Sequence, residues 1–298
     1  MDWVAYTEWS SDTCHTATGD IRVWPQLRSP QLKNSRPIIV YVPPSHATTD
    51  RCFPVLYMHD GQALFDRETN PAGEWCVDET MERLVSKGME AIIVGIPYVD
   101  RVHELSPYAC SASGSEGRGE EYLAFIVDTV RPLIDASFRT RSEPPATGIA
   151  GSSMGGLISL YALIRHPDVF GLCGALSPAL WFGGDRIFRD VGTAELGPCR
   201  IYLDTGTKEV DLSIEESLIA REYRSRLQRA HGAAPISDES ASNLWVDDIR
   251  RFRDLLSGCL PEEAQLLYVE QEHDHSEASW AERFPGAVEF LLSAQAVP

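Results

Sequence analysis

Three short runs of mostly apolar residues stand in the first hundred positions, at 37–42, 54–59 and 91–96. Each ends before a proline or an aspartate, and runs of this length and character predict strands that are covered on both faces. Between the second and third runs, residues 77–87 carry apolar side chains at helical spacing. They are followed by Gly88, which suits the end of a helix. The order strand, helix, strand predicts a right-handed crossover in a mainly parallel sheet.

The rest of the chain repeats this alternation, and no composition shift or internal repeat marks a second domain. Further strands are predicted at residues 171–177, 200–204 and 265–270. Further helices are predicted at residues 121–135, 154–166, 213–231, 245–256 and 278–294. The pattern therefore predicts a single α/β domain over residues 1–298, with a mainly parallel central sheet and helices on both faces.

Several segments have no clear period. Residues 1–15 hold three aromatic side chains and are expected to form an N-terminal extension packed on the body. A brief strand at 21–23 is expected to be broken by Pro25 and Pro30. Loops that would shape a pocket are expected at residues 98–119, 181–197 and 233–245.

The clearest chemical signal is a Gly-x-Ser-x-Gly pattern, which runs from Gly151 to Gly155 between a small-residue strand and the helix predicted at 154–166. This pattern is typical of a nucleophile elbow, where a serine sits at the apex of a strained strand-to-helix turn. Ser153 is the apex residue, because the glycines stand two positions before and after it. The helix that begins at Met154 directs backbone N–H groups to the place where a negative oxygen forms during ester attack.

A serine hydroxyl needs a base to take its proton, and the usual base is a histidine oriented by a carboxylate. In hydrolases built on this elbow, the chain order is serine, acid, histidine. His273 and His275 follow the last predicted strand, from which a loop can reach back to the elbow. The candidates for the acid are Glu209, Asp204 and Asp211, and spacing alone does not choose among them.

The negative oxygen also needs two backbone donors. We expect one to be the N–H of Met154 and the other to come from the turn around Gly61, where a glycine lets the backbone approach closely. His59 and Asp60 are expected to brace this turn without touching substrate. The two histidines around Asp274 have no third ligand cluster in the sequence, so no metal and no other cofactor is expected.

The composition limits the class of partner. The formal charge is −18, from 44 acidic and 26 basic residues, so nucleic acid and anionic membrane surfaces are not expected as partners. No apolar stretch approaches the ~20 residues that span a bilayer, and the N-terminus lacks a secretory pattern. The seven cysteines stand singly, which predicts free thiols in a cytoplasmic protein.

Beyond the elbow, motifs over about residues 35–293 resemble the putative-esterase family of α/β hydrolases. That family includes esterase D, feruloyl and acetylxylan esterases, enterochelin-type esterases and mycolyltransferases. The resembling motifs are Val55–Gln62, Tyr122–Thr140, Gly151–Gly156, Leu176–Trp181, Gly206–Glu209 and His275–Trp280. The resemblance implies the α/β-hydrolase fold and ester hydrolysis by a serine.

The resemblance also implies roles for individual residues. Ser153 would be the nucleophile. Glu209 would be the acid, since the family's acid ends a Gly-Thr-x-acid turn. His275 would be the base, since the family's histidine stands five residues before a tryptophan. The implied oxyanion donors are the N–H groups of Gln62 and Met154, and the implied pocket residues are Trp75 and Trp181.

We therefore expect a serine carboxylesterase that hydrolyses a small-molecule ester through an acyl-enzyme. Acyl transfer to an alcohol and thioester hydrolysis by the same triad are the alternatives within this chemistry. A non-catalytic binding protein on a hydrolase scaffold is the alternative outside it. The absence of a secretory pattern argues against plant-polymer substrates.

Overall fold

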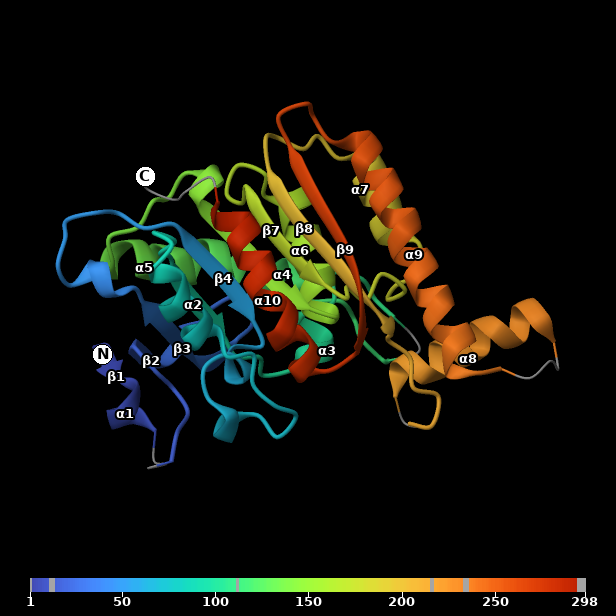
Figure 1. Cartoon of the computed structure of the whole chain (residues 1–298), viewed down its shortest axis with the longest axis horizontal. Coiled ribbons are helices and arrows are strands. Elements are labelled where there is room, and N and C mark those ends of the chain that lie inside the picture. The colour runs from blue at the N-terminus through green and yellow to red at the C-terminus, as the bar shows by residue number, and fades with distance from the viewer. Residues whose placement is uncertain (1, 11–13, 111–112, 215–216, 233–235, 294–298) are drawn as a thin grey trace.

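A computed structural model of the chain describes every residue except 1, 11–13, 111–112, 215–216, 233–235 and 294–298 (Figure 1). Parts of the predicted N-terminal extension, of the expected loops and of the helix at 213–231 lie outside the described residues, as does the last residue of the helix at 278–294.

Within the described residues, nine strands form one sheet in the order β1-β2-β3-β5-β4-β6-β7-β8-β9 (Figure 1). The pairs from β1 to β5 are antiparallel, and the pairs from β5 across to β9 are parallel, so the prediction of a mainly parallel sheet is confirmed. The strands are β1 (Val4–Ala5), β2 (Asp20–Ser29), β3 (Asn34–Val42), β4 (Val55–His59), β5 (Ile92–Ile96), β6 (Thr147–Ser152), β7 (Leu172–Leu176), β8 (Arg200–Lys208) and β9 (Gln265–Asp274).

Helices cover both faces of the sheet (Figure 1). Helices α1, α2 and α10 share one core with the sheet, and α4, α5, α6, α7, α8 and α9 share the other. The helices are α1 (Tyr6–Trp9), α2 (Val77–Val85), α3 (Arg101–Glu104), α4 (Gly119–Phe125), α5 (Arg131–Ser137), α6 (Met154–Arg165), α7 (Arg186–Thr193), α8 (Leu218–His231), α9 (Asp238–Cys259) and α10 (Glu277–Leu292). The 3₁₀ turns are η1 (Pro44–His46), η2 (Gly61–Ala63), η3 (Arg67–Thr69) and η5 (Pro144–Ala146), and the π-helical segment η4 (Ile126–Val130) joins α4 to α5.

Alternate residues of the central strands serve the two cores. In β4, Val55 and Tyr57 belong to the core that contains α6, while Leu56 and Met58 belong to the core that contains α10. Successive side chains of a strand point to opposite faces, so a strand covered on both sides must be apolar throughout. This is why the uninterrupted apolar runs identified the central strands correctly.

The largest difference from the sequence prediction lies in β2, which continues through Pro25 and ends only before Pro30. Its pairing register with β3 shifts between Trp24 and Leu27. A proline cannot donate to the ladder of backbone hydrogen bonds, and a bulge takes up the irregularity. The expectation that Pro25 breaks the strand was therefore wrong.

Other corrections concern helix boundaries. Short helices α3 and α7 lie within expected loops, and β1 and α1 lie within the expected N-terminal extension. Helix α8 begins after Ser217 and α9 begins after Ser237, each of which caps its helix with its hydroxyl. Helix α8 therefore begins later than the predicted residue 213, and α9 occupies much of the loop expected at 233–245.

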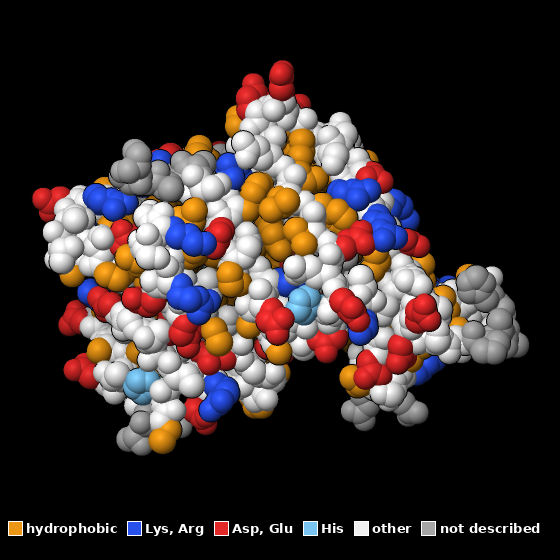
Figure 2. Space-filling view, viewed as in Figure 1, with side chains coloured by type: hydrophobic (Ala, Val, Ile, Leu, Met, Phe, Trp, Pro, Cys, Tyr) orange, Lys and Arg blue, Asp and Glu red, His pale blue; other side chains and the backbone are white. Residues whose placement is uncertain are grey.

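The surface agrees with the acidic composition. Figure 2 shows Asp and Glu side chains scattered over the visible face and interleaved with Lys and Arg, instead of gathered in one field. Each helix among the described residues is too short or too polar to cross a membrane.

Candidate active site

The candidate triad residues each follow directly after a strand of the parallel part of the sheet. Ser153 follows β6, Glu209 follows β8 and His275 follows β9. Parallel strands place their carboxyl ends at the same edge of a sheet, which is where ligands bind in open α/β folds. The extension of β9 beyond the predicted end at residue 270 is what brings His275 to this edge.

Ser153 sits in a strained turn between β6 and α6. Its φ of 55° and ψ of −116° are unfavourable for a residue with a side chain. Its N–H donates to the Leu176 carbonyl of the neighbouring strand, and its own carbonyl accepts from the N–H groups of Leu157 and Ala179. These bonds hold the strained residue in the geometry expected of a nucleophile elbow.

The two flanking glycines leave room for this turn. A Cβ at Gly151 would lie 3.0 Å from the His59 ring and 3.1 Å from the Gly155 backbone. His59 is buried behind the elbow, where its Nδ1 lies 2.8 Å from the Tyr122 hydroxyl. Burial lowers the pKa of His59 to about 4. His59 is therefore neutral at pH 7 and braces the elbow from behind.

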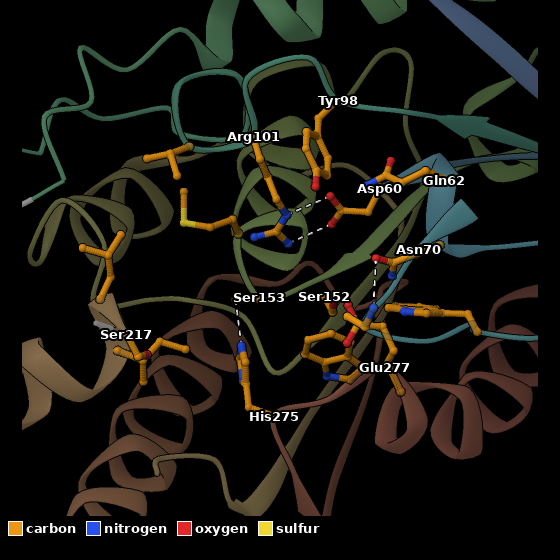
Figure 3. A pocket seen from close by; sticks show the side chains of 18 of the residues that line it. Asp60, Gln62, Asn70, Tyr98, Arg101, Ser152, Ser153, Ser217, His275 and Glu277 are labelled. Atoms are coloured by element: carbon orange, nitrogen blue, oxygen red, sulfur yellow. Dashed lines mark hydrogen bonds and ion pairs between the residues drawn. The ribbon is translucent and has the colours of Figure 1, made fainter. Parts of the chain in front are cut away.

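His275 links the serine to a buried carboxylate. Its Nε2 lies 2.9 Å from the Ser153 Oγ (Figure 3). Its Nδ1 lies 2.6 Å from the Glu209 Oε2. The rings of Trp245 and Trp280 contact the imidazole edge-on, with centroids 5.2 and 5.0 Å away. The structure thus brings three distant side chains into one hydrogen-bonded line.

The other two candidate acids lie elsewhere. Asp204 is buried in the middle of β8 and accepts from Arg283 Nη1 at 2.8 Å, and burial raises its pKa. Asp211 is exposed and accepts from the Ser213 N–H at 2.8 Å. Of the three candidates, Glu209 is the one that contacts the histidine.

Asp211→Asn is expected to leave kcat/KM for a simple ester within about twofold of wild type, since an exposed substitution away from the site has little effect. Steady-state kinetics with a p-nitrophenyl ester measures this. A thousandfold loss would mean that the acid has been assigned to the wrong residue.

The alternative base His273 lies outside this line, with its Nε2 3.8 Å from a Glu282 carboxylate oxygen. Within the described residues, one group of side chains has the spacing of metal ligands, formed by Glu74, Cys76 and Glu79. That group contains neither His273 nor His275, so the histidine pair of the sequence does not take part in it.

The two residues expected to supply the oxyanion donors, Gln62 and Met154, line the same cavity as Ser153. Met154 is the first residue of α6, and Gln62 lies in the short turn η2, so neither N–H has an acceptor within its own helix. Gly61 packs against the next strand, where a Cβ would lie 2.6 Å from the Gly95 carbonyl carbon. The close approach fixes the turn that carries the Gln62 N–H.

A cavity of about 450 Å³ opens over Ser153 (Figure 3). This volume suits a small-molecule ligand. The predicted pocket residues Trp75 and Trp181 both contribute to the wall. Aromatic lining side chains come from five residues, Trp75, Tyr98, Trp181, Phe182 and Trp280.

One charged pair in this wall was missed by sequence reasoning. Arg101 donates from Nε and Nη2 to the two carboxylate oxygens of Asp60, both at 2.8 Å (Figure 3). Asp60 thus braces its turn, as expected, but it also faces the cavity. Arg101 lies in a segment expected to be a loop, and no pattern in the sequence distinguishes it from other surface arginines.

Comparison with known proteins places the chain in a family. The family model described as putative esterase matches residues 29–244, which is more than half of the chain. The uncharacterized protein YbbA of Bacillus subtilis is 26% identical over 66% of this chain and 77% of its own length. A siderophore enterobactin esterase of Emericella nidulans is 29% identical over 45% of this chain and 49% of its own length, so this chain spans about half of that relative.

The fold is also shared with solved structures. The BES protein from Bacillus cereus superposes with a TM-score of 0.68 at 16% identity, over 95% of this chain and 98% of that one. The sheet order, the elbow and the family match agree with one another. The protein therefore belongs to the putative esterase family, among the serine hydrolases with the α/β-hydrolase fold.

Proposed function

We propose that the protein is a serine carboxylesterase that works through an acyl-enzyme on Ser153, within one domain that spans residues 1–298. The observation that supports this most strongly is the hydrogen-bonded line from Ser153 through His275 to Glu209 beside a cavity of small-molecule size. The scattered cysteines support a reducing compartment, and we propose a cytoplasmic enzyme.

The reaction follows from the positions of the groups. As the Ser153 Oγ bonds to the ester carbonyl carbon, its proton passes to His275 Nε2, and the N–H groups of Met154 and Gln62 hold the negative oxygen. His275 then gives the proton to the leaving alkoxide, and the alcohol departs from the acyl-enzyme. Water repeats the two steps, which releases the acid and restores Ser153. Glu209 keeps the Nδ1 proton in place and stabilises the imidazolium.

The aromatic wall favours an ester with a flat or aromatic acyl group, because such a group can stack on Trp181 or Tyr98, the less buried aromatic side chains of the cavity. Two relatives are named as siderophore esterases, so we include a siderophore ester among the substrates to be tested. Because these relatives are distant and matched over part of their length, the siderophore is one member of a panel.

A panel of p-nitrophenyl esters graded by acyl length, with a benzoate, a thioester and enterobactin, tests the proposed function. We expect release of free acid from several oxyesters, with a higher kcat/KM for the benzoate than for a linear acyl group of similar size. Turnover no faster than buffer for every ester would overturn the proposal. Transfer of the acyl group to an added alcohol in preference to water would favour an acyltransferase, and a strong preference for the thioester would favour a thioesterase.

A further inference from the structure

Glu209 is held from behind by groups that are not part of the triad. Its Oε2 faces His275, while its Oε1 accepts from the Ser177 hydroxyl and from the Gly206 N–H, both at 2.5 Å. A Cβ at Gly206 would lie 2.9 Å from this oxygen, so a glycine is needed for the approach. Both carboxylate oxygens therefore have partners, and the carboxylate has a single orientation.

The direction of the Ser177 hydroxyl is set by its own neighbours. Its Oγ lies 2.8 Å from Arg283 Nη2 and 3.4 Å from Trp280 Nε1. Guanidinium and indole nitrogens only donate hydrogen bonds, so both contacts use lone pairs of the Ser177 oxygen. The hydroxyl proton is then left for Glu209. Ser177 is fully buried with a φ of 41°, so this position is held by the fold and not by solvent.

Arg283 connects this serine to a second carboxylate. Its side chain is 0% exposed, and its Nη1 donates to Asp204 Oδ1 at 2.8 Å. The same Asp204 oxygen accepts from the Ser177 N–H at 3.0 Å. The Arg283 Nη2 also lies 4.0 Å from Glu209 Oε1. A buried guanidinium is stable only when it is paired, and here it stands between two carboxylates.

We propose that Ser177 and Arg283 are positioning residues that hold Glu209 against His275, an inference that rests on the proposed function of the triad. The charges along the line alternate, from Asp204 through Arg283 and Glu209 to the imidazolium that forms on His275 during attack. A carboxylate fixed in advance needs no reorganisation when that charge appears. Ser177 also accepts a hydrogen bond from Arg283 Nη2, so this nitrogen does not donate to Glu209.

Without the Ser177 hydroxyl, Arg283 Nη2 loses its acceptor, and Glu209 Oε1, which lies 4.0 Å away, loses a donor. Arg283 then competes with His275 for the same carboxylate. This gives Ser177→Ala an effect on the triad that a simple packing defect would not have. Asp204, one of the candidate acids in the sequence, contacts Arg283 and the Ser177 N–H and does not contact the triad itself.

Ser177→Ala tests the proposal, with Ser29→Ala as the matched control. Ser29 is also fully buried and uses its hydroxyl to accept a backbone N–H, that of Leu32, but it lies in β2. We expect kcat on a p-nitrophenyl ester to fall about tenfold to a hundredfold in Ser177→Ala, with KM within about twofold, as for loss of a hydrogen bond to a charged group. We also expect the downfield proton NMR signal of His275 Nδ1–H to shift or disappear. Ser29→Ala should leave both readouts unchanged.

Active-site titration with a fluorophosphonate counts the folded sites, so kcat can be expressed per site. A loss of kcat from a displaced Glu209 is then distinguished from a loss of folded protein. An unchanged kcat per site with an unchanged NMR signal in Ser177→Ala would overturn the positioning role while leaving the triad in place. Absence of esterase activity in the wild type would instead overturn the proposed function. The double variant Arg283→Met with Asp204→Leu removes both buried charges together, so it avoids an unpaired carboxylate. It should show the same loss of kcat per site, and a wild-type value would contradict the proposal.

Discussion

Ser153→Ala is expected to lower kcat on a p-nitrophenyl ester by about 10⁵- to 10⁶-fold, the scale seen when the nucleophile of a triad is lost. The hydroxyl oxygen of Ser153 forms the bond to the substrate, and its proton is the one that His275 Nε2 accepts across 2.9 Å. The alanine variant lacks both the oxygen and the proton. The variant keeps the Cβ and the strained backbone of the elbow, so its thermal unfolding should match the wild type. Steady-state kinetics and a thermal melt measure the two effects.

Ser152→Ala is the matched control, because the elbow carries two adjacent serines and both are buried. Ser152 is the last residue of β6, one position before the apex. Its loss should change kcat by less than about tenfold. The reverse result, an inactive Ser152→Ala and an active Ser153→Ala, would show that Ser152 is the nucleophile and would contradict the assignment of Ser153.

Glu209→Gln should lower kcat by about 10⁴-fold, the scale known for an acid replaced by its amide in other serine triads. The amide has one correct orientation here. Ser177 and Gly206 both donate to the Oε1 position, so the amide oxygen must stay there and the NH₂ group must face His275.

An NH₂ group at that position donates to His275 Nδ1 and leaves the imidazole proton on Nε2. The Nε2 atom then cannot accept the Ser153 proton. Kinetics on the same ester, with Asp211→Asn measured beside it, checks this result. A Glu209→Gln enzyme within tenfold of wild type would show that another group orients the histidine.

The sequence predicts the central strands and the elbow because their signals are local. An apolar run covered on both faces, or a serine between two glycines, carries its meaning within a few residues. The strand β2 was mispredicted at Pro25 because a bulge in its pairing with β3 tolerates the proline. The sequence of β2 alone does not reveal its pairing register with β3.

The choice among the three acids could not be made locally either. Asp204 lies within β8 and Glu209 directly follows it, and the side chain that meets each one comes from much further along the chain. Arg283 of α10 pairs with Asp204, and His275 meets Glu209. The Asp60–Arg101 pair in the cavity wall was missed for the same reason, since it joins the turn after β4 to helix α3 after β5, and the sheet brings these two segments together.

Covalent labelling tests the central claim most directly. The wild-type protein is treated with a fluorophosphonate, and the modified peptide is identified by mass spectrometry while esterase activity is followed. We expect one phosphonyl group per chain, on Ser153, with activity lost in proportion to labelling and no adduct in Ser153→Ala. An adduct on another serine, or full esterase activity after complete labelling of Ser153, would contradict the assignment.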